Sequence, residues 1–81
     1  MKIHFVGIGG MGMSALAIHR FLMGDSVSGS DIFPGERTMY LKKLGLRVEM
    51  GHSPDNLREA DLVIASRAVP DDNVELIKAR K

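Results

Sequence analysis

The sequence predicts an α/β fold, an open parallel sheet of about four strands in the order 3-2-1-4 with helices on both faces. Three observations support this prediction. Short apolar runs alternate with helical patterns along the 81 residues, which is typical of parallel strand–helix–strand units. A glycine-rich loop directly follows the first apolar run, and an acidic residue, Asp31, ends the second. Right-handed crossovers then favour the order 3-2-1-4.

The strands are expected where β-type residues run between turn signals. The fourth run is the most apolar of them, as expected of a parallel strand that is covered on both faces. A fifth strand would normally follow beside it, so the sequence is interpreted as a truncated single domain over residues 1–81 with one open strand edge. The four predicted strands are residues 3–6, 26–30, 46–50 and 61–66.

The first two helices are expected over residues 13–23 and 36–44. In the first, Ala15, Ile18 and Leu22 fall on one face at helical spacing. Gly45 directly follows the second, where a left-handed C-terminal cap belongs.

Two shorter helices are expected in the second half of the chain. Ser53 and Pro54 have the order of an N-cap and a first helical position, which opens a short helix through residue 57. Asp72 and Glu75 have capping-box spacing for a last helix that ends near Arg80.

Composition excludes several classes of protein. The chain has no cysteine, which rules out disulfides, thiolate zinc sites and cysteine nucleophiles. Eleven basic and ten acidic side chains give a formal net charge of +1, so there is no electrostatic case for nucleic acid or an anionic membrane. No apolar run is long enough to span a bilayer, and no signal-peptide pattern is present, so a cytoplasmic location is expected.

The loop over residues 7–14 carries the functional prediction. Gly7, Gly9 and Gly12 fit the G-x-G-x-x-G pattern of a Rossmann-like nucleotide site. In that pattern Gly7 allows a tight turn, Gly9 lets a phosphate approach, and Gly12 lets the helix pack on the sheet. The helix N-terminus then offers free N–H groups to a diphosphate. Asp31 lies 19 residues after Gly12, close to the spacing of an acid that contacts a ribose.

No Gly-Lys-Ser/Thr follows the loop, so a nucleotide diphosphate is expected to bind here without ATP hydrolysis. Loop and acid together leave a second candidate open, an NAD-binding Rossmann module of a dehydrogenase or regulatory protein. A third is an interaction module, a homodimer formed through the open edge of the fourth strand. No metal site and no catalytic residue are predicted. His4 is expected to be a hydrogen-bonded structural residue, His19 a surface residue, and most of the six methionines core residues.

The loop with its Met-Ser tail resembles the opening of the UDP-N-acetylmuramate–L-alanine ligases, a branch of the Mur ligase family. Further similar segments follow in order along nearly the whole chain. The segments that carry the resemblance are residues 4–14, residues 27–31, Gly51-His52-Ser53 with Asn56, residues 66–69, and Asp72-Asn73.

The resemblance implies a ligase of peptidoglycan synthesis with three domains, of which this chain is the first. That domain binds the UDP part of UDP-N-acetylmuramate. A central domain supplies ATP and magnesium chemistry, in which the muramoyl carboxylate becomes an acyl phosphate that the amine of L-alanine attacks. This chain alone would then be inactive.

The resemblance also implies three groups of binding residues, each following a different strand. The diphosphate residues are Gly9, Gly10, Met11, Gly12, Met13 and Ser14; the uridine and ribose residues are Ser30, Asp31, Ile32 and His52; and the residues on the sugar side are Ser66, Arg67 and Ala68.

Overall fold

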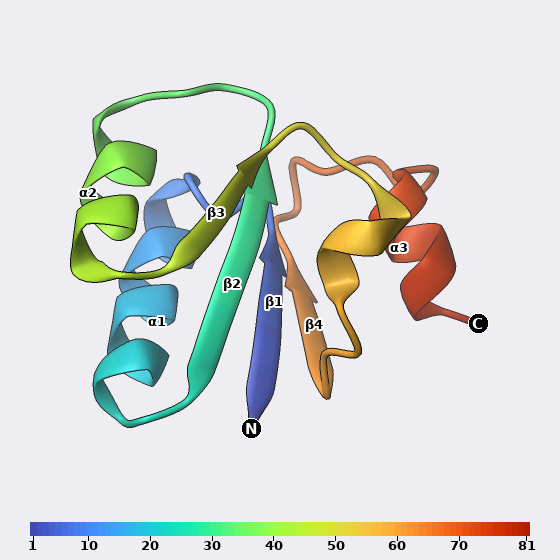
Figure 1. Cartoon of the computed structure of the whole chain (residues 1–81). Coiled ribbons are helices and arrows are strands. Elements are labelled where there is room, and N and C mark those ends of the chain that lie inside the picture. Colours follow the sequence, from blue (N-terminus) through green and yellow to red (C-terminus); the bar gives the residue numbers. More distant parts are fainter.

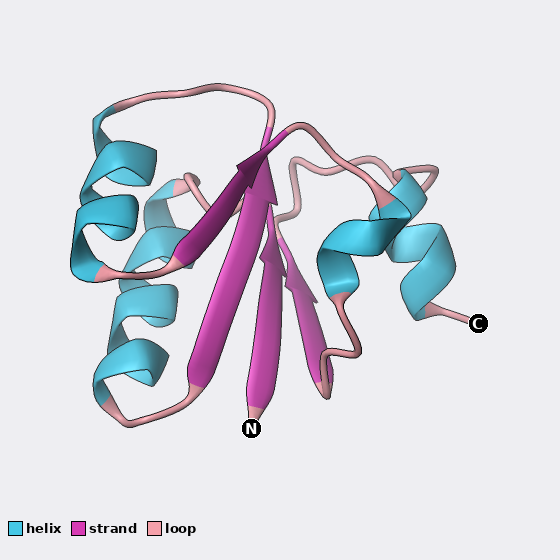
Figure 2. Cartoon of the chain, viewed as in Figure 1, coloured by secondary structure: helices cyan, strands magenta, loops and turns pink.

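A computed structural model describes residues 1–81 and has four parallel strands with helices on both sides (Figure 1). The strand order is β3-β2-β1-β4, so the predicted α/β sheet and its order 3-2-1-4 are confirmed. Helices α1 and α2 cover one face of the sheet, and η1 and α3 lie on the other (Figure 2). The elements are β1 Lys2–Val6, α1 Met11–Leu22, β2 Ser26–Asp31, α2 Glu36–Leu44, β3 Arg47–Met50, η1 Pro54–Leu57, β4 Leu62–Ala65 and α3 Val74–Ala79.

The two faces of the sheet differ because side chains alternate along each strand. On β1, Ile3 and Phe5 are buried in the main apolar core, whereas His4 between them is buried among polar groups. The apolar core lies between the sheet and helices α1 and α2. It consists of Ile3, Phe5, Ile8, Ala17, Val27, Leu41, Leu46 and Val48.

Helix α1 presents a different face to the core from the one predicted. Ala15 and Leu22 are exposed, so that part of the prediction is wrong. The buried positions are Ser14 and Ala17, and Met13, Ile18 and Phe21 pack against the core beside them. The buried stripe of α1 begins one residue earlier than predicted. Since neighbouring helical positions differ by about 100° around the helix axis, this shift turns a different face toward the sheet.

Helix α2 has the predicted bounds and the predicted end. Gly45 adopts a left-handed conformation with φ of 108°, and its N–H donates to the carbonyl oxygen of Lys42. At the helix start, the Thr38 hydroxyl accepts a hydrogen bond from the N–H of Gly35 at 2.9 Å. These contacts fix the direction of the chain as it enters and leaves α2.

The second half of the chain confirms one prediction and departs from two others. Residues 54–57 form the 3₁₀ helix η1, with Ser53 as its predicted N-cap. Asn73, and not Asp72, caps α3, by accepting from the N–H of Glu75 at 2.8 Å. Strand β4 is an edge strand that is not covered on both faces, since Leu62 remains 43% exposed. Its predicted pairing with a second copy of the chain stays a prediction.

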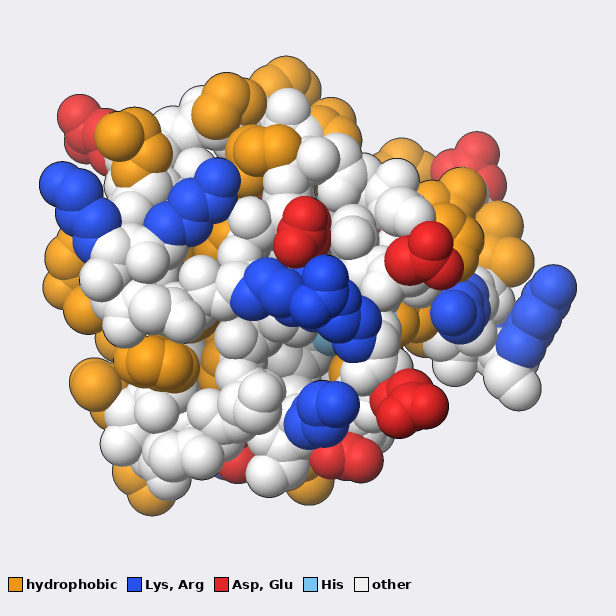
Figure 3. Space-filling model, viewed as in Figure 1, with side chains coloured by type: hydrophobic (Ala, Val, Ile, Leu, Met, Phe, Trp, Pro, Cys, Tyr) orange, Lys and Arg blue, Asp and Glu red, His pale blue; other side chains and the backbone are white.

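The surface carries mixed charge with a local concentration of apolar groups. On the face seen in Figure 3, basic and acidic side chains lie interspersed over the sheet region. Hydrophobic side chains gather at the upper edge of this view, where the loop between β2 and α2 runs; Ile32 and Phe33 in that loop are exposed. Five of the six methionines are exposed, so the prediction that most are core residues is wrong. No helix is both long and apolar enough to cross a membrane.

Candidate functional site

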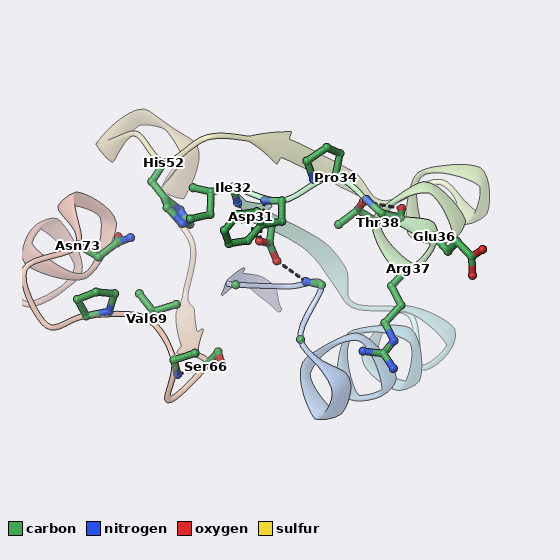
Figure 4. A pocket seen from close by; sticks show the side chains of 17 residues that line it. Asp31, Ile32, Pro34, Glu36, Arg37, Thr38, His52, Ser66, Val69 and Asn73 are labelled. Carbon is green, nitrogen blue, oxygen red and sulfur yellow. Dashed lines mark hydrogen bonds between the residues drawn. The ribbon is translucent and has the colours of Figure 1, made fainter.

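A cleft of about 680 Å³ opens at the carboxyl ends of the strands (Figure 4). Its walls come from the loops after β1, β2 and β4 and from His52, which follows β3. In open parallel sheets this edge is where ligands bind, because loops from neighbouring strands converge there. The lining includes Gly7, Gly9, Gly10, Asp31, Ile32, His52, Ser66 and Ala68 among the residues singled out from the sequence.

The glycine loop begins with the predicted tight turn. Gly7 has φ of 81°, a conformation that side chains rarely tolerate. A Cβ at this position would also meet Val69 at 3.0 Å and Ser66 at 3.1 Å. The N–H groups of Gly7 and Ile8 both donate to the carbonyl oxygen of Ser30, at 2.8 and 3.0 Å. Gly7 thus holds the loop against both β2 and the segment after β4.

Gly9 is held by a protein carboxylate. Its N–H donates to Oδ2 of Asp31 at 2.8 Å, and a Cβ on Gly9 would lie 2.8 Å from the same oxygen. The close approach that requires glycine here is therefore made by Asp31. The phosphate approach expected at Gly9 is not needed to explain this glycine.

Gly12 does not have the packing role that its motif position predicts. A Cβ added there would meet nothing within 4 Å, and the residue is exposed on the first turn of α1. The N–H groups of Met11, Gly12 and Met13 have no hydrogen-bond partner. Three free donors at the positive end of a 12-residue helix can receive an anion.

The remaining predicted loop residues lie in different environments. Gly10 lines the cleft, and Met11 beside it points into solvent with 76% of its surface exposed. Met13 packs against the core, and Ser14 is buried with its hydroxyl 3.4 Å from the carbonyl oxygen of Met11. Met11, Gly12, Met13 and Ser14 do not line the cleft, so the structure brings only Gly9 and Gly10 of the six predicted diphosphate residues to its wall.

Asp31 organises the wall of the cleft that follows β2. Besides holding Gly9, it accepts hydrogen bonds at Oδ1 from the N–H groups of Ile32 at 2.8 Å and Phe33 at 3.2 Å. An ionised carboxylate has about four acceptor positions, so one remains for a ligand hydroxyl. Ile32 and Phe33 form an apolar surface next to it.

The residues after β4 supply the opposite wall. Ser66 and Ala68 line the cleft, and the Ser66 hydroxyl accepts from the N–H of Ala68 at 3.2 Å. Arg67 lies between them but is exposed and does not line the cleft. Arg37, at the start of α2, is the arginine that lines the cleft, and sequence reasoning did not single it out. Figure 4 shows its side chain extending from α2 toward α1.

Behind the cleft, Glu75 of α3 binds five groups although its side chain is fully buried. Its Oε1 lies 2.6 Å from Nε2 of His4 and 2.8 Å from the hydroxyl of Ser30. Its Oε2 accepts from His52 Nδ1 at 2.9 Å, and the N–H of Ser53 and the side-chain amide of Asn56 donate to the same oxygen at 3.2 and 3.0 Å. A buried carboxylate is stable only when it is fully hydrogen-bonded in this way.

The protonation state of Glu75 follows from these contacts. Burial raises the pKa of its carboxyl, but hydrogen bonds from His4, Asn56, Ser30 and His52 outweigh it and lower the pKa from 4.5 to about 2. Glu75 is therefore ionised near neutral pH and can only accept hydrogen bonds.

Sequence reasoning missed this role because Glu75 has capping-box spacing from Asp72, and a surface capping role explained the residue. A signal was present. Polar His4, Ser28 and Ser30 occupy alternate positions on two central strands, where apolar residues are usual. A polar partner above that face was therefore required.

His4 and His19 have the predicted roles, and the predicted uridine contact of His52 stays a prediction. His4 is a buried structural residue whose Nδ1 lies 2.8 Å from the Ser28 hydroxyl, and His19 is exposed on α1. His52 lines the cleft and is also part of the Glu75 cluster. No three His, Asp or Glu side chains are grouped as a metal would require.

Comparison with known proteins gives one consistent family. A family model described as "Mur ligase family, catalytic domain" matches residues 2–81. The UDP-N-acetylmuramate–L-alanine ligase of Thermotoga petrophila is 59% identical over 80 residues, which are 99% of this chain. The enzyme of the same name from Clostridium perfringens is 48% identical over 80 residues. The chain spans 18% of the length of each of these relatives.

Two solved structures share the fold. The crystal structure of the UDP-N-acetylmuramate–alanine ligase of Thermotoga maritima matches 99% of this chain with a TM-score of 0.95 and 57% identity, over 19% of its own length. A murein peptide ligase from Psychrobacter arcticus matches 98% of the chain with a TM-score of 0.82 and 32% identity, over 17% of its own length.

Proposed function

The chain belongs to the Mur ligase family, and we propose that its cleft binds the UDP part of UDP-N-acetylmuramate. In this proposal the 81 residues form the substrate-binding domain of an ATP-dependent ligase that joins L-alanine to that substrate in the cytoplasm. The observation that carries it is the cleft at the strand ends, flanked by three unpaired N–H groups at the start of α1. Those donors and the helix dipole favour a diphosphate.

The wall residues support an assignment of the two ends of the ligand. Gly10 and the first turn of α1 would hold the diphosphate, with Arg37 as the cleft's arginine. Asp31 and His52 offer polar atoms for the nucleoside, beside the apolar surface of Ile32 and Phe33. Ser66 and Ala68 face them from the loop after β4 and would border the sugar.

ATP and magnesium chemistry is not assigned to these residues. The chain has no Gly-Lys-Ser/Thr motif and no group of three side chains suited to a metal. What this chain contributes to the ligase reaction is therefore proposed to be binding and orientation of the substrate. The alternative, an NAD-binding module, gains no support from the relatives described above, which are ligases.

Amide NMR titration tests the proposal directly. We expect UDP-N-acetylmuramate at millimolar concentration to shift the amides of residues 9–14 and of His52, and NAD to shift them much less. If NAD produced the larger shifts, or if the UDP-sugar left these amides unchanged, the proposed ligand would be wrong.

Gly12→Ala separates ligand binding from folding. Because a Cβ at Gly12 meets no protein atom, this variant should fold at least as stably as the wild type. The methyl group would stand beside the free N–H groups, so UDP-sugar affinity should fall about tenfold. Unchanged affinity would remove the first turn of α1 from the site.

Arg37→Ala and Arg67→Ala form a matched pair with the same loss of charge. Arg37 lines the cleft and Arg67 does not, so only Arg37→Ala should weaken binding, by about three- to tenfold. The effect should shrink as salt is added, because salt screens exposed charges. A larger effect of Arg67→Ala would reverse this assignment in favour of the residue that the family resemblance indicated.

A further inference from the structure

The side of His52 that faces away from the cleft is fixed by the protein. Its Nδ1 lies 2.9 Å from Oε2 of Glu75 and 2.9 Å from the Ser30 hydroxyl. Glu75 is ionised and accepts only, so Nδ1 must carry a proton and donate it. The Ser30 hydroxyl gives its own proton to Oε1 of Glu75, so it too receives from Nδ1.

The other ring nitrogen is left free. Nε2 of His52 has no hydrogen-bond partner, yet it is not among the buried polar atoms that lack one, so it is open to solvent. His52 lines the cleft, and Figure 4 shows its ring on the wall opposite the α1 side. In a neutral imidazole with its proton on Nδ1, Nε2 is an acceptor.

We propose that Glu75 is a positioning residue that fixes His52 in its Nδ1–H form, so that the cleft presents Nε2 as an acceptor for an N–H or O–H donor of the nucleoside. This inference rests on the proposed function and adds a rule of selectivity to it. A nucleoside group that can donate is accepted at this point, and one that can only accept is rejected. Without the carboxylate the Ser30 hydroxyl could turn and donate to Nδ1, which would reverse the polarity of the ring in the cleft.

Nitrogen-15 NMR of the wild-type chain without ligand is the first test. Long-range proton–nitrogen correlations distinguish a protonated ring nitrogen from a bare one. At a pH where the imidazole ring is neutral, we expect His52 to show a protonated Nδ1 and a bare Nε2. A neutral ring with its proton on Nε2 would overturn the inference whether or not UDP binds.

Glu75→Met with Glu49→Met as matched control tests the role of Glu75. Methionine keeps the length of the side chain but removes both acceptor oxygens, and Glu49 lies on β3, does not line the cleft and pairs only with Arg47. In Glu75→Met we expect a second His52 tautomer, with its proton on Nε2, to appear beside the Nδ1–H form. In Glu49→Met we expect only the Nδ1–H form, as in the wild type. A folded Glu75→Met chain with unaltered His52 signals would assign the tautomer to Ser30 instead; if the variant does not fold, the wild-type spectrum still decides.

Ligand analogues identify the donor. UDP is compared with N3-methyl-UDP, which lacks the imide N–H, and with 2′-deoxy- and 3′-deoxy-UDP, which each lack one hydroxyl. With the wild type, we expect one of the three analogues to bind about two- to tenfold more weakly than UDP. With His52→Leu, the same analogue should bind as tightly as UDP, because the acceptor it would have contacted is gone. Equal wild-type affinities for all four would overturn the inference while leaving UDP binding intact, whereas no binding of UDP at all would contradict the proposed function itself.

Discussion

The two faces of the sheet belong to the same strands but are stabilised by different interactions, apolar packing on one and hydrogen bonds to a buried charge on the other. Toward α1 and α2, Ile3, Phe5 and Val27 are packed in an apolar core. Toward α3 and η1, His4 and Ser30 alternate with them and bind the buried carboxylate of Glu75. Apolar packing is non-directional and tolerates many partners, whereas a buried charge needs each hydrogen bond in place. The first face therefore holds the fold together, and the second fixes the position of a cleft residue.

The largest expected loss of stability comes from a substitution in the apolar face. Phe5 is 0% exposed at the centre of the core, so Phe5→Ala should lower the free energy of unfolding by about 3–5 kcal/mol. Phe33→Ala is the control, because Phe33 is 74% exposed and its loss should change stability by less than about 0.5 kcal/mol. Urea unfolding followed by circular dichroism measures both; similar losses in the two variants would contradict this placement of the core.

Acid should break the polar face next. The pKa of Glu75 is lowered from 4.5 to about 2 on folding, so its contribution is fully present above pH 4.5 and is lost as the pH falls toward 2. A shift of this size corresponds to about 3 kcal/mol, as an order of magnitude. Urea unfolding of wild type and Glu75→Gln across this pH range isolates the contribution. Two parallel stability curves would show that Glu75 does not carry it.

Gly29 sharpens the comparison, because it shows how closely the apolar face is packed. A Cβ on Gly29 would lie 2.6 Å from Cβ of Ile8, a fully buried side chain. Gly29→Ala should therefore lower the free energy of unfolding by about 1–3 kcal/mol through overpacking. Gly12→Ala, with no atom in reach, is the matched control and should not destabilise the chain. Thermal melts of the two variants test this, and an equally stable Gly29→Ala would mean that Ile8 moves aside freely.

The smallest effect is expected outside both faces. Arg80 pairs with Asp71 at 3.4 Å, but the two side chains are 59% and 95% exposed. Solvent screens such a pair, so Arg80→Ala should leave the melting temperature unchanged within error. A clear loss of stability would show that this end of α3 supports the Glu75 cluster.

The sequence predicted most of the fold because local patterns carried it. Apolar runs, the Gly45 cap and the glycine turn at Gly7 each depend on residues close in the chain, and each is found where the pattern placed it. The register of α1 was less well predicted. Its buried face was shifted to Ser14 and Ala17, since the contact with the sheet and not the helix itself decides which stripe is covered.

The candidate site also has a part that the sequence predicted and a part that it did not. The loop, the acid at the end of β2 and His52 follow strand ends, and the parallel sheet brings all three to one cleft, as the sequence predicted. Sequence alone did not assign Arg37 to that cleft. Nor did it give the reason for Gly9, which is the Asp31 carboxylate against its backbone.

By itself, then, the sequence determined the order of elements, the strand order of the sheet and the edge where a ligand would bind. Only the tertiary structure decided what Glu75 does. The carboxylate reaches His4, which lies 71 residues away in the chain, and no pattern of near neighbours reports such a contact. A buried charge is specified by the whole set of donors that surround it, and those donors meet only when the sheet and α3 have come together.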